Sequence, residues 1–170
     1  MEIKIPFYHV LNMFLTGLVF IGGCTMVYPD YAADLLVSDL IVNLGTGPEI
    51  VFTVCVFAAA YEVGIIINRI GSVVIEPVLI KTKLMPFNGD YKKFNDRKKE
   101  YPIMSTLSRE YALSRTGIAL FGILAAVAVY AKAKFLMWAF ASTAVIYFLS
   151  CRKHNKKIMD LMKNQEYLRL

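Results

Sequence analysis

Three charged side chains stand seven residues apart in one long apolar stretch, YEVGIIINRIGSVVIEPVLIK at residues 61–81. They are Glu62, Arg69 and Glu76: an acid, a base and a second acid. On a regular α-helix, a step of seven residues ends only about 20° short of two full turns, so the sequence predicts one stripe of charges. Neighbours on that stripe are about 10 Å apart, which is too far for a direct ion pair. Each charge must therefore find water or a partner from another segment.

Glu62 is expected near the centre of a membrane-crossing helix, where an unpaired carboxylate costs roughly 3 kcal/mol or more. One interpretation is that Glu62, Asn68 and Arg69 line a polar path or a site between subunits. The alternative is structural: Glu62 pairs with Asn12, and Arg69 reaches a lipid phosphate at the inner boundary. Glu76 is expected beyond the membrane, in the cytoplasm.

Small and polar residues mark the first apolar run, NMFLTGLVFIGGCT at residues 12–25. Asn12 and Thr16 are one turn apart and share a face, and Gly23 lies seven residues beyond Thr16. Such residues suit close contacts between membrane helices, and they also suit the wall of a pore. Both interpretations stay open, with Asn12 and Thr16 as candidate polar residues of the membrane interior.

Residues that could support catalysis or hold a metal are sparse. His9 and His154 have no serine, cysteine or acid at an informative spacing, and no known catalytic or phosphate-binding motif occurs. The three cysteines, Cys24, Cys55 and Cys151, show no CxxC or Cys/His ligand spacing. The sequence therefore predicts no enzymatic activity, no metal site and no cofactor.

Composition indicates a membrane protein. Hydrophobic residues make up 57% of the 170 residues, charged residues only 19%, and the mean hydropathy is +0.52. Four runs are long and apolar enough to cross the hydrocarbon core; they lie at residues 7–28, 50–75, 115–131 and 135–150. The last two are separated only by KAK and could be one kinked helix, but together they are too long for a single crossing. We therefore expect an all-α membrane protein with four transmembrane helices, forming one domain over residues 1–170.

The distribution of Lys and Arg predicts the orientation. Ten of these cations lie in residues 69–115, six in residues 152–170 and one at Lys4, whereas the turn between the last two runs has two. The connection at residues 28–49 has none and carries four acids. Cytoplasmic loops are enriched in Lys and Arg, so both termini and the middle region should face the cytoplasm. Residues 81–114 and the tail at 151–170 then form helical cytoplasmic extensions.

A basic, aromatic-flanked segment, YKKFNDRKKEY at residues 91–101, dominates the cytoplasmic region. A helix is expected to begin at Ser105 or Thr106 and to run into the third span. The basic layer has three interpretations: contact with anionic membrane lipids, binding of a nucleotide or short single-stranded oligonucleotide, or docking of a soluble protein partner. The candidate ligand-binding residues are Lys92, Lys93, Arg97, Lys98, Lys99, Arg109, Tyr111 and Arg115.

With four spans, an intramembrane acid and a basic inner face, the chain resembles the small membrane effectors of bacterial antiphage systems. The resemblance is closest to the HalB-type transmembrane subunits of Hailong systems, followed by the KwaA-type subunits of Kiwa systems. It is a resemblance of architecture over the whole chain and carries no short motif. It implies a homo-oligomeric channel in the bacterial inner membrane, controlled by a nucleotide signal from a partner nucleotidyltransferase. In the Hailong type, a deoxyadenylate oligomer keeps the channel silent.

These observations together predict a ligand-gated, oligomeric channel or pore-forming effector, with a tetramer as the expected assembly and the first or second span lining the pore. The alternative is a non-conducting membrane scaffold that recruits a soluble partner through its cytoplasmic region. A small transporter fits less well, because no paired, Gly- or Pro-broken short spans occur in two matching halves.

Overall fold

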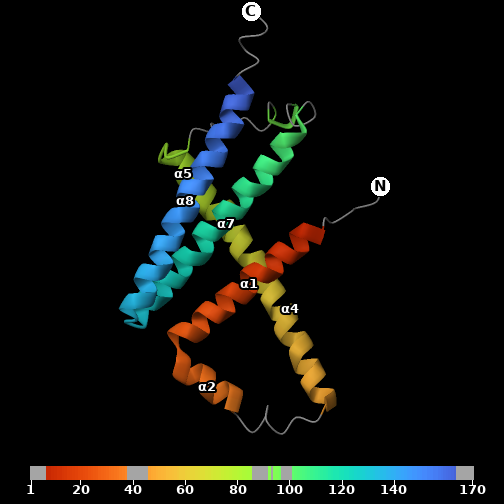
Figure 1. The fold of residues 1–170 in the computed structure, drawn as a ribbon, viewed down its shortest axis with the longest axis vertical. Helices are drawn as coiled ribbons and strands as arrows, with labels where there is room; N and C mark the ends of the chain where they lie inside the picture. Colours follow the sequence, from red (N-terminus) through yellow and green to blue (C-terminus); the bar gives the residue numbers. More distant parts are fainter. Residues whose placement is uncertain (1–6, 38–45, 86–91, 93, 97–100, 164–170) are drawn as a thin grey trace, which may run out of the picture. The chain divides into compact units, whose positions relative to one another are not determined.

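The computed structural model describes residues 7–37, 46–85, 92, 94–96 and 101–163. The regular secondary structure of these residues is entirely helical. Figure 1 shows their order along the chain. The helices are α1 (Phe7–Val27), α2 (Pro29–Val37), α4 (Thr46–Ile70), the π-helix η1 (Gly71–Ile75), α5 (Glu76–Lys81), α7 (Pro102–Tyr130) and α8 (Lys134–Lys163). The prediction of an all-α chain is confirmed for these residues.

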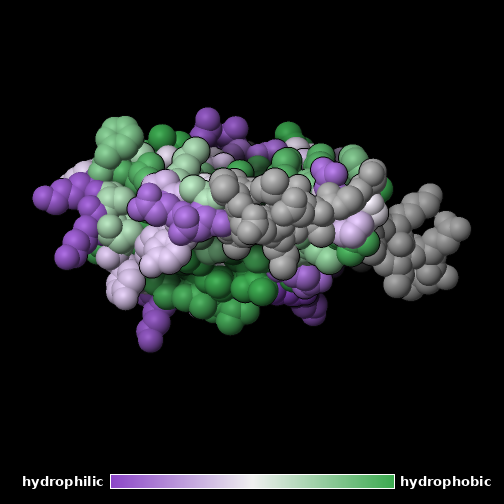
Figure 2. Space-filling model, turned by 90° about the horizontal axis from the view of Figure 1, so that it is seen from below, coloured by the Kyte–Doolittle hydropathy of each residue, from purple (hydrophilic) through white to green (hydrophobic). Residues whose placement is uncertain are grey.

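Four of the helical segments are long and apolar enough to cross a membrane. They are Phe7–Val27, Gly47–Lys81, Pro102–Tyr130 and Lys134–Met162. Large apolar side chains lie exposed on them, and Figure 2 shows broad hydrophobic areas at the surface beside hydrophilic side chains. In water such a surface would be unusual, whereas lipid tails cover it without penalty. The chain is therefore a multi-pass membrane protein.

The chain reverses direction between α7 and α8 over residues 131–133. Lys132 has a φ of 59°, in the left-handed region. Its backbone N–H donates to Val129 O at 3.0 Å, and the N–H of Ala133 donates to Ala128 O at 2.9 Å. These two bonds are those of a Schellman motif, which ends a helix by satisfying its last carbonyls. Residues 115–150 thus form two helices rather than one kinked helix.

The described residues fall into two compact units, and α4, α7 and α8 each contribute to both. In the first unit (residues up to 68 with 120–141), α1 and α4 approach through glycines. A Cβ atom placed on Gly17 would meet Ala60 O at 1.7 Å, and one on Gly64 would meet Met13 O at 1.8 Å. Backbones this close require residues without side chains, as is typical of membrane helix pairs.

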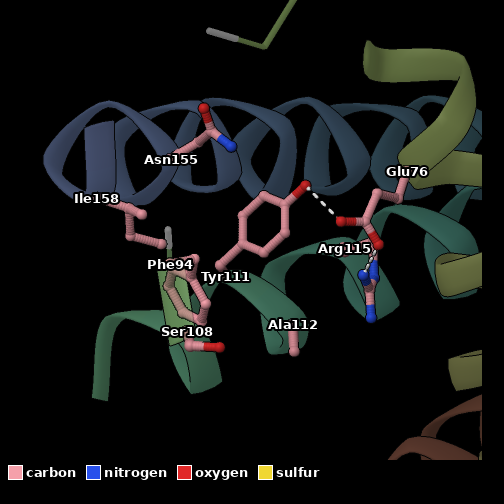
Figure 3. A pocket seen from close by; sticks show the side chains of 8 residues that line it. All are labelled: Glu76, Phe94, Ser108, Tyr111, Ala112, Arg115, Asn155 and Ile158. Carbon is pink, nitrogen blue, oxygen red and sulfur yellow. Dashed lines mark hydrogen bonds and ion pairs between the residues drawn. The ribbon is translucent and has the colours of Figure 1, made fainter. Parts of the chain in front are cut away.

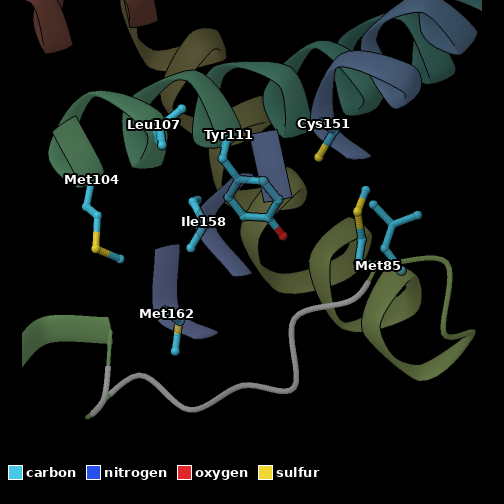
Figure 4. Close-up of a cluster of buried hydrophobic side chains, with 8 residues drawn as sticks. Met85, Met104, Leu107, Tyr111, Cys151, Ile158 and Met162 are labelled. Atoms are coloured by element: carbon cyan, nitrogen blue, oxygen red, sulfur yellow. The ribbon is translucent and has the colours of Figure 1, made fainter. Parts of the chain in front are cut away.

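The second unit (69–119 with 142–170) contains a hydrophobic core built from the ends of α5, α7 and α8. Figure 4 shows the cluster, which consists of Leu79, Met85, Met104, Leu107, Tyr111, Cys151, Ile158 and Met162. Its three methionines fill irregular space between the helices. The helix α7 begins at Pro102, slightly before the predicted Ser105, because proline at the first helical position already has the required φ. This core holds the helix ends that line the candidate site.

Candidate functional site

A pocket with a volume of about 160 Å³ lies in the second unit, beside the methionine-rich core. Its lining residues come from α5, α7, α8 and the short segment at 94–96, and they are Glu76, Phe94, Ser108, Tyr111, Ala112, Arg115, Asn155 and Ile158. A cavity of about 150 Å³ accommodates a benzene molecule, so this pocket has room for one small group or ring. Figure 3 shows the polar side chains of three helices facing this space.

The charged centre of the pocket is an ion pair between Glu76 Oε2 and Arg115 Nη1. The two side chains are only 12% and 13% exposed, respectively. Arg115 Nη2 also donates a hydrogen bond to Ser72 Oγ at 2.8 Å. The guanidinium of Arg115 on α7 therefore binds two positions of the η1–α5 segment, Ser72 within η1 and Glu76 directly after it. In a partly buried position, such charge-assisted bonds are stronger than the same bonds in water.

Tyr111 lies one turn before Arg115 on α7 and completes the group. Its hydroxyl donates to Glu76 Oε1 at 3.4 Å, as the dashed line in Figure 3 shows. The Arg115 guanidinium carbon lies 5.8 Å from the centroid of the Tyr111 ring, within the range of a cation–π interaction. Tyr111 thus contacts both partners of the ion pair, while its ring is buried in the core.

One polar atom of this group lacks a hydrogen-bond partner. Arg115 Nε is buried and finds no acceptor among the described residues. Since an unmade buried hydrogen bond is expensive, Nε is a donor ready for an oxygen of a bound molecule or water. Glu76 already offsets the charge of Arg115, so a bound anion would have to displace or share that carboxylate.

The π-helix η1 decides where Glu76 points. The backbone N–H of Glu76 donates to Gly71 O, five residues back, instead of four. Such a wide turn takes up one extra residue, so Glu76 does not continue the seven-residue stripe expected from regular α-helical geometry. Glu62 and Arg69 are exposed, whereas Glu76 turns toward Arg115 and its side chain is largely buried. The charged stripe predicted from the sequence therefore ends at η1.

The candidate intramembrane residues differ in exposure. Glu62 and Arg69 lie exposed on α4, and Asn68 is half-buried. Thr16 is buried in α1, and its hydroxyl donates to Asn12 O of the same helix at 2.8 Å. Because only 7% of Thr16 is exposed, its side chain belongs to the packed face of α1.

The candidate ligand-binding residues are only partly brought together. Tyr111 and Arg115 line the pocket. Arg109 is exposed, donates from Nη2 to Thr106 Oγ1 at 3.3 Å and is not a lining residue. Lys92 is exposed. The remaining candidates, Lys93, Arg97, Lys98 and Lys99, lie outside the described residues.

Of the eight residues that line the pocket, only Tyr111 and Arg115 were among the predicted binding residues. Glu76 was recognised as an isolated acid, but its pairing with Arg115, 39 residues away, leaves no local pattern. Ser72 and Asn155 carried no signal of their own. Asn155 is one helical turn before Ile158, and the apolar spacing of the tail (Ile158, Leu161, Met162) predicts a helix whose buried face includes that position.

Among the described residues, no group of three or more His, Cys, Asp or Glu side chains is placed to hold a metal ion. The chain matches no protein-family model, no curated protein and no solved structure.

Proposed function

We propose that this chain is the subunit of a homo-oligomeric membrane channel or pore-forming effector, and that a ligand or soluble partner at its cytoplasmic pocket controls conduction. The resemblance to antiphage membrane effectors suggests bacterial defence as the setting and a nucleotide or short oligonucleotide as the signal. The expected assembly is a tetramer in the bacterial inner membrane, with both termini in the cytoplasm.

The exposure of Glu62 is the observation that carries this proposal. Its carboxylate lies near the middle of the 35-residue apolar segment Gly47–Lys81. The surrounding surface is apolar, with Phe57 and Ile66 exposed to 51% and 57%. Placing a carboxylate in lipid at this depth costs roughly 3 kcal/mol or more, so such residues face water-filled cavities or other protein segments. A pore between several copies of the chain supplies both.

The pocket provides the second half of the proposal. Its walls are the ends of α5, α7 and α8, each of which continues into a membrane-length helical segment. A ligand that binds one arrangement of these ends more tightly than another shifts the balance between the two arrangements. The ion pair of Glu76 and Arg115 is the group in the pocket that an anionic ligand would contest.

Single-channel recording from the purified protein in planar bilayers tests the proposal, with and without short oligonucleotides on the cytoplasmic side. We expect discrete currents whose cation-to-anion permeability ratio falls severalfold in Glu62→Gln, because a pore-lining carboxylate attracts cations. Glu49→Gln, a neutralised acid in the first turn of the same helix, is the matched control and should keep the wild-type ratio.

The mass of the complex in detergent is measured in parallel for all three proteins. Unchanged assembly with altered permeation supports a pore role for Glu62. If the Glu62→Gln complex dissociates in detergent, Glu62 is instead a residue that holds the subunits together. Wild-type protein that assembles but never conducts would contradict the channel and favour the scaffold, for which the exposed cations of α8 (Arg152, Lys153, Lys156 and Lys157) provide a surface suited to an acidic partner.

A further inference from the structure

We infer that one side of α8 is a binding surface for anionic phospholipid. Acyl chains cover the apolar part of this surface, and lipid phosphates bind four cations directly beyond it. The surface lies on the other side of α8 from the pocket, so it goes beyond the proposed function and can be measured without any current.

The C-terminal half of α8 has two sides of opposite character within one continuous helix (Figure 1). Its buried side consists of Cys151, Asn155, Ile158 and Met162. Its exposed side carries four cations, Arg152, Lys153, Lys156 and Lys157. At about 100° per residue, the cations cover an arc of about 140°, and the centre of this arc lies about 160° from the centre of the buried stripe. The four charges therefore point away from the core of the second unit.

Nothing in the described part of the chain neutralises these cations. None of their side chains takes part in an ion pair or a hydrogen bond with a residue that the structure describes. The sole acid of α8, Asp160, lies one turn beyond Lys156 and forms no ion pair with it. Like charges one turn apart on a helix repel each other, so an anion bound between these cations would relieve the repulsion.

The exposed side of α8 is apolar immediately before the cations. Val145, Ile146 and Leu149 are each more than half exposed, and helical geometry places them within the same arc as the cations. The four cations then follow about 3–10 Å beyond Ser150, where the apolar run ends. A headgroup layer is about 5–8 Å thick on each side of the hydrocarbon core. This side of α8 therefore matches a phospholipid, with an apolar surface for acyl chains followed by a cationic surface for phosphates.

The direction of the side chains favours lipid over a soluble partner. On an α-helix, the Cα–Cβ bonds lean toward the N-terminus, and in α8 that direction leads back to the apolar run. The long Lys and Arg side chains therefore carry their charges toward the lipid phosphates, while their methylene stems cover apolar surface. This geometry is the same on whichever side of the membrane the C-terminus lies. An acidic soluble protein would have to meet cations that lean toward the membrane.

Fluorescence quenching by brominated lipid tests this inference in the full-length protein. The chain has a single tryptophan, Trp138. Combining Trp138→Phe with Leu149→Trp moves the only indole fluorophore onto the proposed surface, one turn before the cations. The protein is reconstituted into vesicles of phosphatidylcholine and brominated phosphatidylglycerol, and into the mixture in which only phosphatidylcholine is brominated. The two quenching curves give the binding constant of the anionic lipid beside position 149 relative to that of the zwitterionic lipid.

We expect phosphatidylglycerol to bind beside position 149 severalfold more tightly than phosphatidylcholine. Replacing all four cations by glutamine should bring the ratio of binding constants close to one. Replacing only the three lysines by arginine keeps the charges and should preserve the ratio. The matched control replaces four other exposed cations of the second unit by glutamine and should keep most of the preference; these are Lys81, Lys83, Lys92 and Arg109.

A ratio close to one in the reporter protein with its cations intact would overturn the inference. An equal loss in the control variant would also overturn it, because the preference would then reflect net charge rather than one side of α8. If a soluble polyglutamate peptide changes the fluorescence at position 149 and phosphatidylglycerol does not, the surface binds an acidic protein partner instead. None of these results depends on conduction, so the channel proposal is tested separately.

Discussion

At the scale of single residues, the ion pair of Glu76 and Arg115 is the interaction on which the second unit should depend most. Both side chains are almost nine-tenths buried, and each is held by further contacts from Tyr111 or Ser72. Removing one partner of a buried pair leaves the other charge uncompensated, which typically costs about 3 kcal/mol or more. Removing one charge of the pair is therefore expected to lower the free energy of unfolding more than removing both charges.

Arg115→Ala is accordingly expected to lower the free energy of unfolding in detergent by about 3 kcal/mol. The double variant Arg115→Ala, Glu76→Gln should recover part of that loss, because it no longer buries a lone carboxylate. Arg109→Ala is the matched control, since Arg109 is exposed on the same helix; its effect should stay within about 0.5 kcal/mol. Equal losses for the two arginine variants, or a double variant worse than Arg115→Ala, would contradict a structural role for the pair.

At the scale of helices, close contacts between glycines and backbone decide how α1 meets α4. The backbone oxygens of Ala60 and Met13 occupy the positions that side chains of Gly17 and Gly64 would take. Because backbone cannot move aside as a flexible side chain can, even one methyl group must push the helices apart. The edge-to-face pair of Phe14 and Phe57, with ring centroids 5.4 Å apart, would be disturbed with it.

Gly17→Ala should therefore lower the free energy of unfolding by roughly 1–3 kcal/mol, the usual effect of overpacking. Gly22→Ala in the same helix is the control, because a Cβ atom there meets nothing within 4 Å. It should be neutral or stabilising by up to about 1 kcal/mol, the difference in helix propensity between the two residues. Chemical unfolding in mixed micelles, followed by circular dichroism, measures both. A Gly17→Ala variant as stable as Gly22→Ala would mean that α1 does not pack on α4 through this glycine.

The sequence predicts which segments form long helices better than it predicts the register within each helix. Long apolar runs predicted the four long helices, since length and hydropathy are local properties. The register of α4, η1 and α5 was not predictable, because no local pattern in the sequence indicates the wide turns of η1, and Glu76 meets Arg115 only through tertiary packing. The seven-residue spacing of Glu62, Arg69 and Glu76 assumed a uniform helix, and one extra residue in η1 was enough to separate Glu76 from the other two.

The candidate site shows the same limit. Tyr111 and Arg115 were identified because a basic helix with an aromatic residue suits phosphate and base binding. The acid that neutralises Arg115 and the amide of Asn155 join the pocket only through tertiary packing. Lys92 and Arg109 satisfied the same compositional criterion yet lie exposed and do not line the pocket. Charge alone, therefore, does not distinguish a binding residue from a solvated one.

At the scale of the whole molecule, charge asymmetry and hydropathy together predict the topology in the membrane. Seventeen of the nineteen Lys and Arg residues should face the cytoplasm, and the two at the turn between α7 and α8, Lys132 and Lys134, should face the opposite side. Four membrane crossings in this order would return the chain to the side on which it started. On this prediction, the pocket is expected on the cytoplasmic side, within reach of a ligand or partner made inside the cell.

Reporter fusions test this topology. A fluorescent protein fused after Leu170 should fold and fluoresce, whereas alkaline phosphatase at the same position should be inactive, since it requires the oxidising side of the membrane. Inserting either reporter between Lys132 and Ala133 should give the reverse pattern, because that turn is expected outside the cytoplasm. Active phosphatase at the C-terminus would place the pocket on the outer side. Control by a cytoplasmic nucleotide would then be impossible, even if the protein conducts.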